Sequence, residues 1–347
     1  MTQLTLEQFI QLGARGYNHV PVMRQMFADL DTPLSCYVKV ARGAYSYLLE
    51  SAAQGGEKWS RYSVVGLPAS YVAKVFGHEV VIEEDGAETE RFQCDDPLSF
   101  VEELHGRFRY PELEQLPIYT GGLVGYFGYD AIRYVEQKLA GSAPPDKLPT
   151  PDILLMVSND IIVFDNVLGR IHLITHADPG QGAEAYEQAV QRLDSMVASL
   201  AADVPDSLRA PQRAPQLHEA DFASSYGEDS FKQDVERIRD YIVAGDVMQV
   251  VLSQRMSVSF ESDPLNLYRA LRSLNPSPYM YFLDLRDFHI VSSSPEILAR
   301  LDQGEVTVRP LAGTRRRGLD EAEDLAMEEE LLADPKELAE HLMLIDL

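Results

Sequence analysis

Two groups of side chains near the C-terminal end of this sequence have the types and spacing needed to hold a small anion beside a metal ion. The first is a Gly313-Thr314 turn followed by three arginines, 315–317. Its backbone N–H groups, hydroxyl and cationic side chains suit a carboxylate ligand. The second is the pair Glu337 and Glu340, which a helix would place on one face. Together, these groups indicate a site for an anionic substrate and a hard divalent cation.

The carboxylates of the second group allow a functional and a structural interpretation. Asp334-Pro335 is typical of a helix start, with Glu337 in capping-box register. Capping does not account for Glu340 and His341, which follow Glu337 on the same helical face. One or two carboxylates, with room for water and substrate oxygens, are sufficient to bind magnesium. Spacing alone favours a solvated or salt-bridged face and leaves a magnesium site open as the alternative.

Three further features carry polar groups whose role the sequence leaves open. The arginines 315–317 either form the anion site or turn toward the acidic run 320–330. Glu296 follows an expected strand end, where it is either a general acid or a turn cap. Gln249 is a neutral side chain in an otherwise apolar strand predicted over 247–256, so we expect it in a hydrogen-bonded core or lining a pocket.

The composition is that of an ordinary globular protein, and it argues against several classes. A chain of 347 residues with 45% hydrophobic residues can bury a large core. Its formal net charge of -25 disfavours nucleic-acid binding, which requires clustered Lys and Arg. Cys36 and Cys94 are too few and too far apart for a disulfide framework or a zinc site. Because no signal peptide or membrane-spanning run is recognised, we expect a cytoplasmic protein that does not bind membranes.

The order of predicted elements indicates an α+β protein built on antiparallel sheet. Alternating apolar and polar runs separated by turns predict strands through the first half of the chain. Apolar spacing predicts a helix over 22–30, whereas 34–40 is predicted as a strand. The proline-bearing polar stretch 206–222 is the best candidate for a linker or surface crossing. We therefore expect an N-terminal domain over 1–205 and a second domain over 223–347.

A segment rich in glycine and aromatic residues, 119–130, has two interpretations. It could be a phosphate loop, but it lacks the Gly-Lys-Ser/Thr ending of such loops. We instead predict a strand in which backbone or aromatic rings pack closely over the glycines.

Four motifs in the C-terminal part occur in an order that is typical of one enzyme family. With them the chain resembles the chorismate-utilising enzymes from about residue 35 to its last residue, and within that family the anthranilate synthase branch. The resemblance implies a two-domain α+β fold in which antiparallel sheets pack as a sandwich with helices outside. The motifs are the stretches 244–255, 293–296, 309–315 and 337–343.

The resemblance implies a lyase reaction that starts from chorismate. Relatives that add water carry a lysine base where this chain has Gln249, and a neutral glutamine cannot act as that base. Aminodeoxychorismate synthases commonly carry a lysine nucleophile where this chain has Ala312, which cannot form the covalent intermediate. Both positions favour anthranilate synthase, the first step of tryptophan biosynthesis. Aminodeoxychorismate synthase and an inactive tryptophan-binding fragment are the alternatives.

By the same resemblance, Gly313 and Thr314 contact chorismate, and Glu340 is a ligand of a Mg2+ cofactor with Glu337 nearby. Ammonia is expected from a separate glutamine amidotransferase subunit, component II, because neither cysteine has the flanking glycines of a glutaminase nucleophile. The active protein would therefore be a hetero-oligomer. The residues assigned to catalysis are Glu296, Gln249 and Thr314.

The resemblance also implies a regulatory site for tryptophan, which inhibits the family by feedback. An apolar slot for the indole and a carboxylate or hydroxyl for the amino group make physical sense. Without the family, the same segments would be interpreted as a strand end and a helix stop. The residues assigned to this site are Glu50, Ser51, Arg61, Asn275, Pro278, Tyr279 and Met280.

The last residues, 342–347, form a run of core-type side chains without a polar tail. We expect the chain to be incomplete at its C-terminus, with a docked helix that ends buried as the alternative. The family pattern continues with a histidine, a glycine-rich loop, a substrate arginine and further glutamate ligands. This chain alone is therefore expected to lack part of the site.

Overall fold

The chain divides into two compact units in the computed structural model. The first unit comprises Met1–Val204 and Tyr268–Leu347, and the second comprises Pro205–Leu267. The expected linker 206–222 lies in the second unit, and its residues 210–215 lie outside the described residues. The residues that the structure describes are 4–51, 61–114, 116–144, 148–209 and 216–346.

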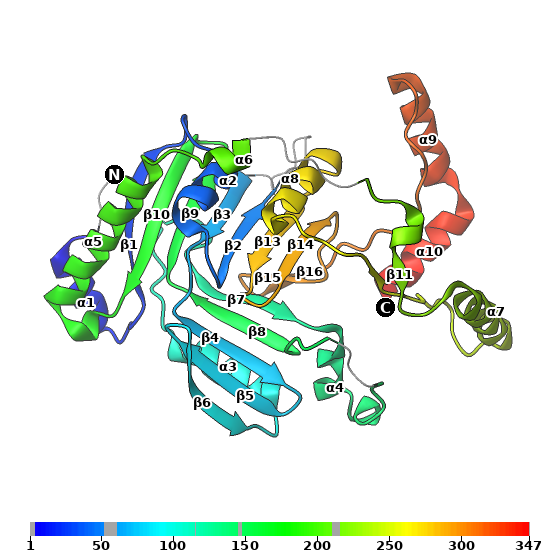
Figure 1. Ribbon diagram of the computed structural model, residues 1–347, viewed down its shortest axis with the longest axis horizontal. Helices are drawn as coiled ribbons and strands as arrows, with labels where there is room; N and C mark the ends of the chain where they lie inside the picture. Colours follow the sequence, from blue (N-terminus) through cyan, green and yellow to red (C-terminus); the bar gives the residue numbers. More distant parts are fainter. Residues whose placement is uncertain (1–3, 52–60, 115, 145–147, 210–215, 347) are drawn as a thin grey trace. The chain divides into compact units, whose positions relative to one another are not determined.

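Two antiparallel sheets form the centre of the first unit (Figure 1). In spatial order, the described strands of the larger sheet are β1 (Val20–Phe27), β10 (Arg170–Ala177), β9 (Asp160–Asp165), β3 (Tyr62–Gly66), β2 (Ser46–Glu50), β13 (Tyr279–Asp284) and β14 (His289–Ser294). Those of the smaller sheet are β6 (Ala87–Gln93), β5 (Glu79–Glu84), β4 (Tyr71–Phe76), β8 (Ile153–Ser158) and β7 (Gly122–Phe127).

The two sheets pack face to face over one apolar core. Val163 and Ile174 of the larger sheet share a buried cluster with Leu154 and Met156 of the smaller sheet. The side chains alternate along each strand, so residues two apart, such as Ile161 and Val163 of β9, face this core together. The predicted α+β fold, with antiparallel sheets packed as a sandwich, is confirmed.

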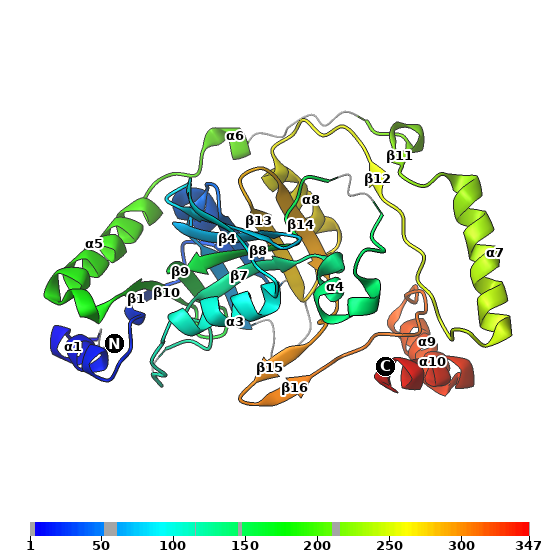
Figure 2. The ribbon, with the colours of Figure 1, turned by 90° about the horizontal axis from the view of Figure 1, so that it is seen from below.

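Helices cover the outer faces of both sheets. α5 (Ala183–Leu200) packs on β10 and buries Ala189, Leu193 and Met196 at helical spacing. α3 (Pro97–Arg107) starts at the Asp96 cap and lies against the smaller sheet (Figure 2). It packs Phe100 and Leu104 into an apolar cluster of that sheet. The remaining helices before residue 200 are α1 (Leu6–Ala14), α2 (Pro33–Cys36) and α4 (Ile132–Val135).

The pairing of β2 with β13 joins segments from both sides of the expected linker. Met280 lies opposite Glu50, and Asp284 lies opposite Ser46. β13 follows α8 (Pro264–Leu274), and β14 then pairs with β13 at the edge of the sheet. The compact units thus divide the chain differently from the expected domains, whose boundaries stay a prediction.

Two of the predicted elements near the N-terminus are wrong. The helix expected over 22–30 is instead β1, in which the neighbours Val22 and Met23 are both buried because they face opposite sides of the sheet. The strand expected over 34–40 is helical, as α2 followed by a π-helical stretch at Tyr37–Ala41. Its start is fixed by a capping box in which Thr32 and the residue at the third helical position exchange hydrogen bonds.

The glycine-rich segment is a strand, as predicted. Gly122–Phe127 forms β7 and pairs with β8. A Cβ at Gly125 would collide with the backbone carbonyl of Leu154, because the two strands approach closely there. Glycine at this position is therefore required by packing.

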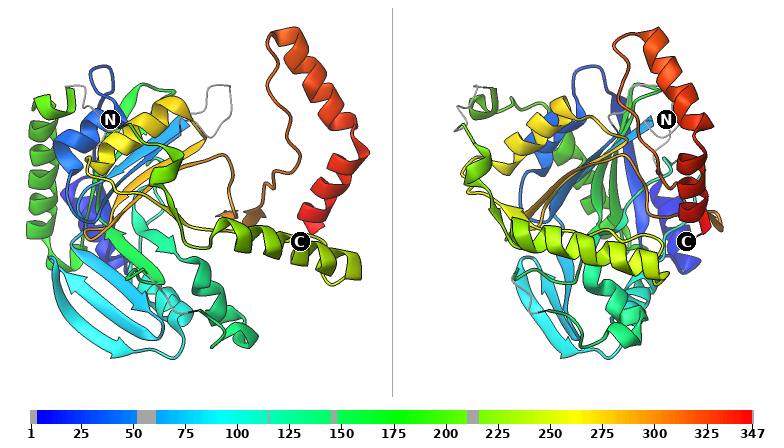
Figure 3. Two further views of the ribbon diagram at one scale, coloured as in Figure 1. Left: turned by 45° about the vertical axis from the view of Figure 1, so that its right-hand side comes forward. Right: turned by 90° about the vertical axis from the view of Figure 1, so that its right-hand side faces the viewer.

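The remaining elements are short or helical. β15 (Arg300–Asp302) and β16 (Glu305–Thr307) form a hairpin, and α9 (Glu321–Ala333) is followed by α10 (Pro335–Asp346) with Asp334 between them (Figure 3). The second unit contains α6 (Asp206–Arg209), β11 (Ala223–Ser224), α7 (Glu228–Ala244) and β12 (Met256–Ser257).

Replacement of Gly125 tests the close approach of β7 and β8. Gly125→Ala should lower the free energy of unfolding by about 2 kcal/mol, because the added methyl group overpacks the sheet. Gly106, inside α3, is a matched control, since a Cβ there meets nothing within 4 Å. Gly106→Ala should raise that free energy by about 0.5 kcal/mol through helix propensity. Urea titrations of both variants check the prediction, and equal stabilities would contradict it.

Candidate functional site

The turn that carries Gly313 lies against the Glu337 carboxyl group. A Cβ added to Gly313 would lie 2.9 Å from Cδ of Glu337 and 2.9 Å from Cδ1 of Leu331. Both atoms belong to the ends of flexible side chains, which would have to move to admit a larger residue, so glycine allows the close contact between the turn and this carboxyl group. Glu337 is half-buried in the first turn of α10. The structure therefore brings a predicted substrate residue next to a predicted metal ligand.

Arg315 fixes the Glu337 carboxylate from the other side. Its Nη1 lies 3.1 Å from Oε1 of Glu337, its Nη2 lies 2.8 Å from Oδ2 of Asp334, and its Nε lies 3.1 Å from Oε1 of Glu330. The Arg315 side chain is only 22% exposed. One guanidinium thus ties the end of α9 to the start of α10 and leaves Oε2 as the Glu337 oxygen nearest Gly313.

The neighbouring arginines turn toward the acidic run, which was one of the two interpretations of this cluster. Arg316 pairs with Glu323, and Arg317 lies 2.7 Å from Asp324. Both arginine side chains are exposed, at 61% and 91%. Exposed ion pairs of this kind contribute little to stability. Of the three arginines, Arg315 is the one with an organised environment.

Glu296 reaches the same turn from the opposite direction. Its Oε1 accepts a hydrogen bond of 2.8 Å from the backbone N–H of Leu311, just before Gly313. Its own N–H donates to the Ser294 hydroxyl at 3.3 Å. The side chain therefore caps the turn in the described state, while its exposed position keeps it open to a ligand. Thr314 is also exposed, and the catalytic roles of both residues stay predictions.

The donor set of this region fits magnesium in kind. Glu340 is half-buried one turn after Glu337, whereas His341 is exposed. Magnesium needs only one or two protein carboxylates when water and substrate supply the rest. Among the described residues, no group of three or more His, Cys, Asp or Glu side chains could hold a metal ion. The region thus offers carboxylate oxygens beside the Gly313 turn without forming a closed metal cage.

Gln249 lies in the second unit and is exposed. The strand predicted over 247–256 is wrong, because only Met256 of this range belongs to β12. β12 pairs with the two-residue β11, so the described part of this stretch has no partner strand that could cover its apolar side chains. Val251, for example, is 85% exposed. The expectation of an interior glutamine is therefore also wrong, and its functional role stays a prediction.

The segments assigned to the regulatory site meet at one end of the strands β3, β2 and β13 in the larger sheet. This end of the strands, which carries Glu50, is called the Glu50 edge. Glu50 ends β2, and Met280, near the start of β13, lies directly opposite it. β3 is antiparallel to β2 on the other side, with Val64 opposite Leu49. Arg61, which immediately precedes β3, is therefore at the same edge. Segments far apart in the sequence thus lie together, while their role as a regulatory site stays a prediction.

Glu50 is the centre of a hydrogen-bonded group at this edge. It is 5% exposed and accepts a 2.6 Å hydrogen bond from the Tyr268 hydroxyl. Arg272 donates from Nε to Oε2 at 3.0 Å and from Nη2 to Oε1 at 3.1 Å. Burial and the charge of Glu50 raise the pKa of Tyr268, so this hydroxyl stays protonated and acts as a donor.

The other predicted residues at the edge have different surroundings. The Ser51 hydroxyl is buried and has no hydrogen-bond partner among the described residues. The carbonyl of Asn275 accepts from the Ser293 hydroxyl at 2.7 Å. Pro278 and Tyr279 are half-buried. The Ser51 hydroxyl is therefore a polar group to which a ligand could supply the hydrogen-bond partner.

Arg61 is engaged elsewhere in the described state. Its Nη2 lies 2.6 Å from Oδ2 of Asp165, and its Nε also donates to this carboxylate. Burial opposes the charge of Asp165, but the Arg61 bonds and backbone N–H groups lower the pKa of this carboxyl. The structure thus places Arg61 at the correct edge but pairs it with Asp165 rather than with Glu50.

Sequence reasoning missed Tyr268, Arg272 and Asp165. Tyr268 and Arg272 are four residues apart on α8, the spacing that places side chains on one helical face. That pair was a signal in the sequence, but a tyrosine and an arginine at this spacing occur on many solvated helices. Their partner Glu50 is 218 positions away from Tyr268, so only the folded sheet identifies the group.

Comparison with known proteins assigns the chain to a family. A family model described as chorismate binding enzyme matches residues 46–347. The chain belongs to the chorismate binding enzyme family. Proteins named anthranilate synthase component 1 are 54% identical in Pseudomonas aeruginosa and 49% identical in Neisseria gonorrhoeae. The alignments cover 98% and 99% of this chain and 69% of each relative.

Solved structures give the same assignment. Anthranilate synthase component I from Streptococcus pneumoniae matches 92% of this chorismate binding enzyme with a TM-score of 0.69 and 30% identity. This chain spans 66% of that protein. MenF, the menaquinone-specific isochorismate synthase of Escherichia coli, shares the fold at a TM-score of 0.53 and 13% identity.

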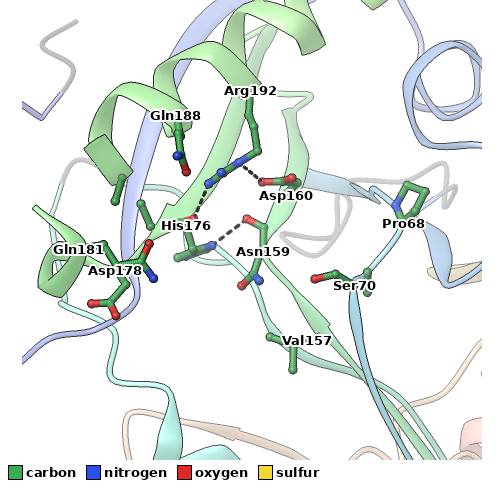
Figure 4. A pocket seen from close by; sticks show the side chains of 13 residues that line it. Pro68, Ser70, Val157, Asn159, Asp160, His176, Asp178, Gln181, Gln188 and Arg192 are labelled. Carbon is green, nitrogen blue, oxygen red and sulfur yellow. Dashed lines mark hydrogen bonds and ion pairs between the residues drawn. The ribbon is translucent and has the colours of Figure 1, made fainter. Parts of the chain in front are cut away.

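This chorismate binding enzyme also has a cavity of about 330 Å³ between α5 and the strands beside it, and no residue assigned to a site lines it (Figure 4). The polar groups that line this cavity contact one another. Arg192 lies 3.5 Å from Asp160 and donates to the carbonyl of His176 at 2.8 Å. Burial lowers the pKa of His176 to about 4, so this imidazole is neutral at pH 7.

Among the described residues, no helix has the length and apolar character needed to cross a membrane.

Replacement of Arg315 tests whether it organises the start of α10. Arg315→Gln should speed amide exchange in the first turn of α10 by about tenfold, because three carboxylates lose their shared cation. Arg316→Gln is the control, since Arg316 pairs with Glu323 on the exposed surface. Hydrogen exchange read by mass spectrometry over residues 330–340 distinguishes the variants. If both variants exchange like the unmodified chain, the organising role of Arg315 is wrong.

Proposed function

We propose that this chain forms the chorismate-binding part of an anthranilate synthase large subunit. The whole enzyme would convert chorismate and ammonia to anthranilate and pyruvate with Mg2+. The observation that supports this most is the packing of Gly313 against the Glu337 carboxyl group, in a chain that is 54% identical to a protein named anthranilate synthase component 1. This chain spans 69% of that relative, so the complete activity is proposed for a protein of the relative's full length.

In this proposal, the Gly313 turn binds the substrate. Backbone N–H groups and the Thr314 hydroxyl would hold a chorismate carboxylate, since glycine leaves space for close approach. Glu337 and Glu340 would hold Mg2+, which supplies positive charge to the substrate carboxylate. Arg315 would hold the Glu337 carboxylate in place, because it donates to Oε1 at 3.1 Å. Substrate and metal would therefore meet where glycine lets the turn approach the Glu337 carboxyl group closely.

The proposed reaction uses ammonia as the nucleophile. A neutral glutamine at position 249 cannot deprotonate water, so Gln249 argues against a water-adding relative. Alanine at position 312 cannot form a covalent intermediate, so Ala312 argues against aminodeoxychorismate synthesis. The Glu296 carboxylate accepts a hydrogen bond from Leu311, which is two residues before Gly313. From this position it would be suited to proton transfer at the ring of chorismate.

Ammonia would be supplied by a separate glutamine amidotransferase subunit. A glutaminase needs a reactive thiolate. Cys36 is buried, and burial together with the charge of Asp31 raises the pKa of its thiol to about 12. Such a thiol is not a nucleophile at pH 7. A hetero-oligomer in the cytoplasm would therefore carry the full glutamine-dependent activity.

We also propose that the Glu50 edge binds tryptophan as a feedback inhibitor. The Glu50 carboxylate and the Ser51 hydroxyl, which has no hydrogen-bond partner among the described residues, would receive the amino group. Met280 lies directly opposite Glu50, and Tyr279 beside it is half-buried. Both residues would belong to the apolar slot for the indole ring. Binding at this edge would couple the level of the final product to the activity of the subunit.

Product analysis tests the proposed reaction. A polypeptide of the relatives' full length that contains this chain should convert chorismate and ammonium salt to equal amounts of anthranilate and pyruvate. Fluorescence detects anthranilate, and a coupled lactate dehydrogenase assay detects pyruvate. Chelation of Mg2+ with EDTA should stop both products, and added Mg2+ should restore them. Formation of aminodeoxychorismate without pyruvate would contradict the proposal and favour aminodeoxychorismate synthase.

A further inference from the structure

The Glu50 carboxylate is held by one helix in a single orientation. Tyr268 and Arg272 of α8 both donate to Oε2, at 2.6 Å and 3.0 Å, and Arg272 also donates to Oε1 at 3.1 Å. Tyr268 is fully buried at 0% exposed, while the Arg272 side chain is 41% exposed. A carboxylate with donors on both oxygens cannot rotate freely, so its remaining lone pairs have fixed directions.

The two oxygens of Glu50 differ in the capacity they have left. Oε2 receives a hydrogen bond from Tyr268 and another from Arg272, which together satisfy it. Oε1 receives the single bond from Arg272 among the described residues. Ser51, the next residue, has a buried hydroxyl that lacks a partner in the described part of the chain. The acceptor capacity left over at this edge suits a donor-rich cation such as a primary ammonium group.

We propose that Tyr268 and Arg272 are positioning residues of the amino-acid site: they hold the Glu50 carboxylate so that Oε1 recognises the ammonium group of the ligand. This inference rests on the proposed regulatory function of the edge. It assigns selectivity for the amino group to two side chains that do not themselves touch the ligand. The apolar surface near Met280 and Tyr279 would contribute to binding without distinguishing whether the ligand carries an amino group.

A positioning role predicts that loss of one donor to Glu50 changes the affinities of two related ligands differently. Tryptophan carries the ammonium group, whereas indole-3-propionate has the same ring and carboxylate without it. If Tyr268 is replaced by Phe, Oε2 loses one donor and the carboxylate can turn away from its aligned direction. The affinity for tryptophan then falls, while the affinity for indole-3-propionate does not depend on this alignment.

Calorimetric titration of the chain with both ligands tests the proposal. In Tyr268→Phe, we expect the dissociation constant for tryptophan to rise about tenfold and that for indole-3-propionate to change less than twofold. Arg272→Lys keeps the charge but loses the paired N–H donors, so it should give a smaller rise for tryptophan alone. Because the Arg272 side chain is partly exposed, this second variant should fold like the unmodified chain.

Tyr281→Phe is the matched control, because Tyr281 lies on β13 next to Met280 and opposite Leu49. It should leave both dissociation constants unchanged, and thermal unfolding of all variants identifies any general loss of stability. Equal weakening of both ligands in Tyr268→Phe would overturn the positioning role and leave the regulatory site intact. No tryptophan binding by the unmodified chain would overturn the regulatory site and this inference together.

Discussion

In the larger sheet, β2 hydrogen-bonds to β13, and the candidate regulatory site exists only because of this pairing. The contact between Tyr268 and Glu50 closes a separation of 218 positions, which costs chain entropy. Burial of Leu48 and Phe282, which lie opposite each other in the paired strands, helps to offset that cost. The same pairing forces Glu50 to be buried, and a buried carboxylate must be given donors. α8 supplies them immediately before the chain enters β13.

Both candidate sites use an arginine to fix a glutamate. Arg272 binds Glu50 at the sheet edge, and Arg315 binds Glu337 beside the Gly313 turn. The chain has 55 acidic and 30 Lys or Arg residues, so at least 25 carboxylates cannot have a cation of their own. Glu50 and Glu337 therefore differ from the many exposed carboxylates, because each is at least half-buried and is paired with an arginine. In each case, an oxygen is left toward the place where the ligand would bind.

The family and the sandwich of antiparallel sheets could be predicted, because both depend on local patterns that the chain carries intact. Gly125 was correctly assigned to a closely packed strand, since few other structures need so many glycines among aromatics. The errors arose where local and long-range forces disagree. Residues 22–30 have an apolar spacing that suits a helix, yet pairing with β10 makes residues 22–27 part of β1.

The candidate sites show the same division. The turn at Gly313 and the glutamate at 337 could be proposed from spacing, but the shared cation Arg315 was one of three similar arginines until its partners were known. Tyr268 and Arg272 carry no motif, and their role depends on a strand that lies far away in the sequence. Gln249 was expected inside because its neighbours are apolar, whereas in the described chain those neighbours are exposed. Apolar sequence predicts burial only when a partner surface is present.

The pairing of β2 with β13 in the stated register is the central claim, and a cross-strand disulfide tests it most directly. In a chain whose Cys36 and Cys94 are replaced by alanine, Leu49→Cys and Tyr281→Cys place two thiols at directly opposite positions. Mild oxidation should join them, as a mobility shift that a reducing agent reverses. Leu49→Cys with Phe282→Cys should not join, because Phe282 lies opposite Leu48 and faces the other side of the sheet. A disulfide in the second pair but not in the first would contradict the register on which the Glu50 site depends.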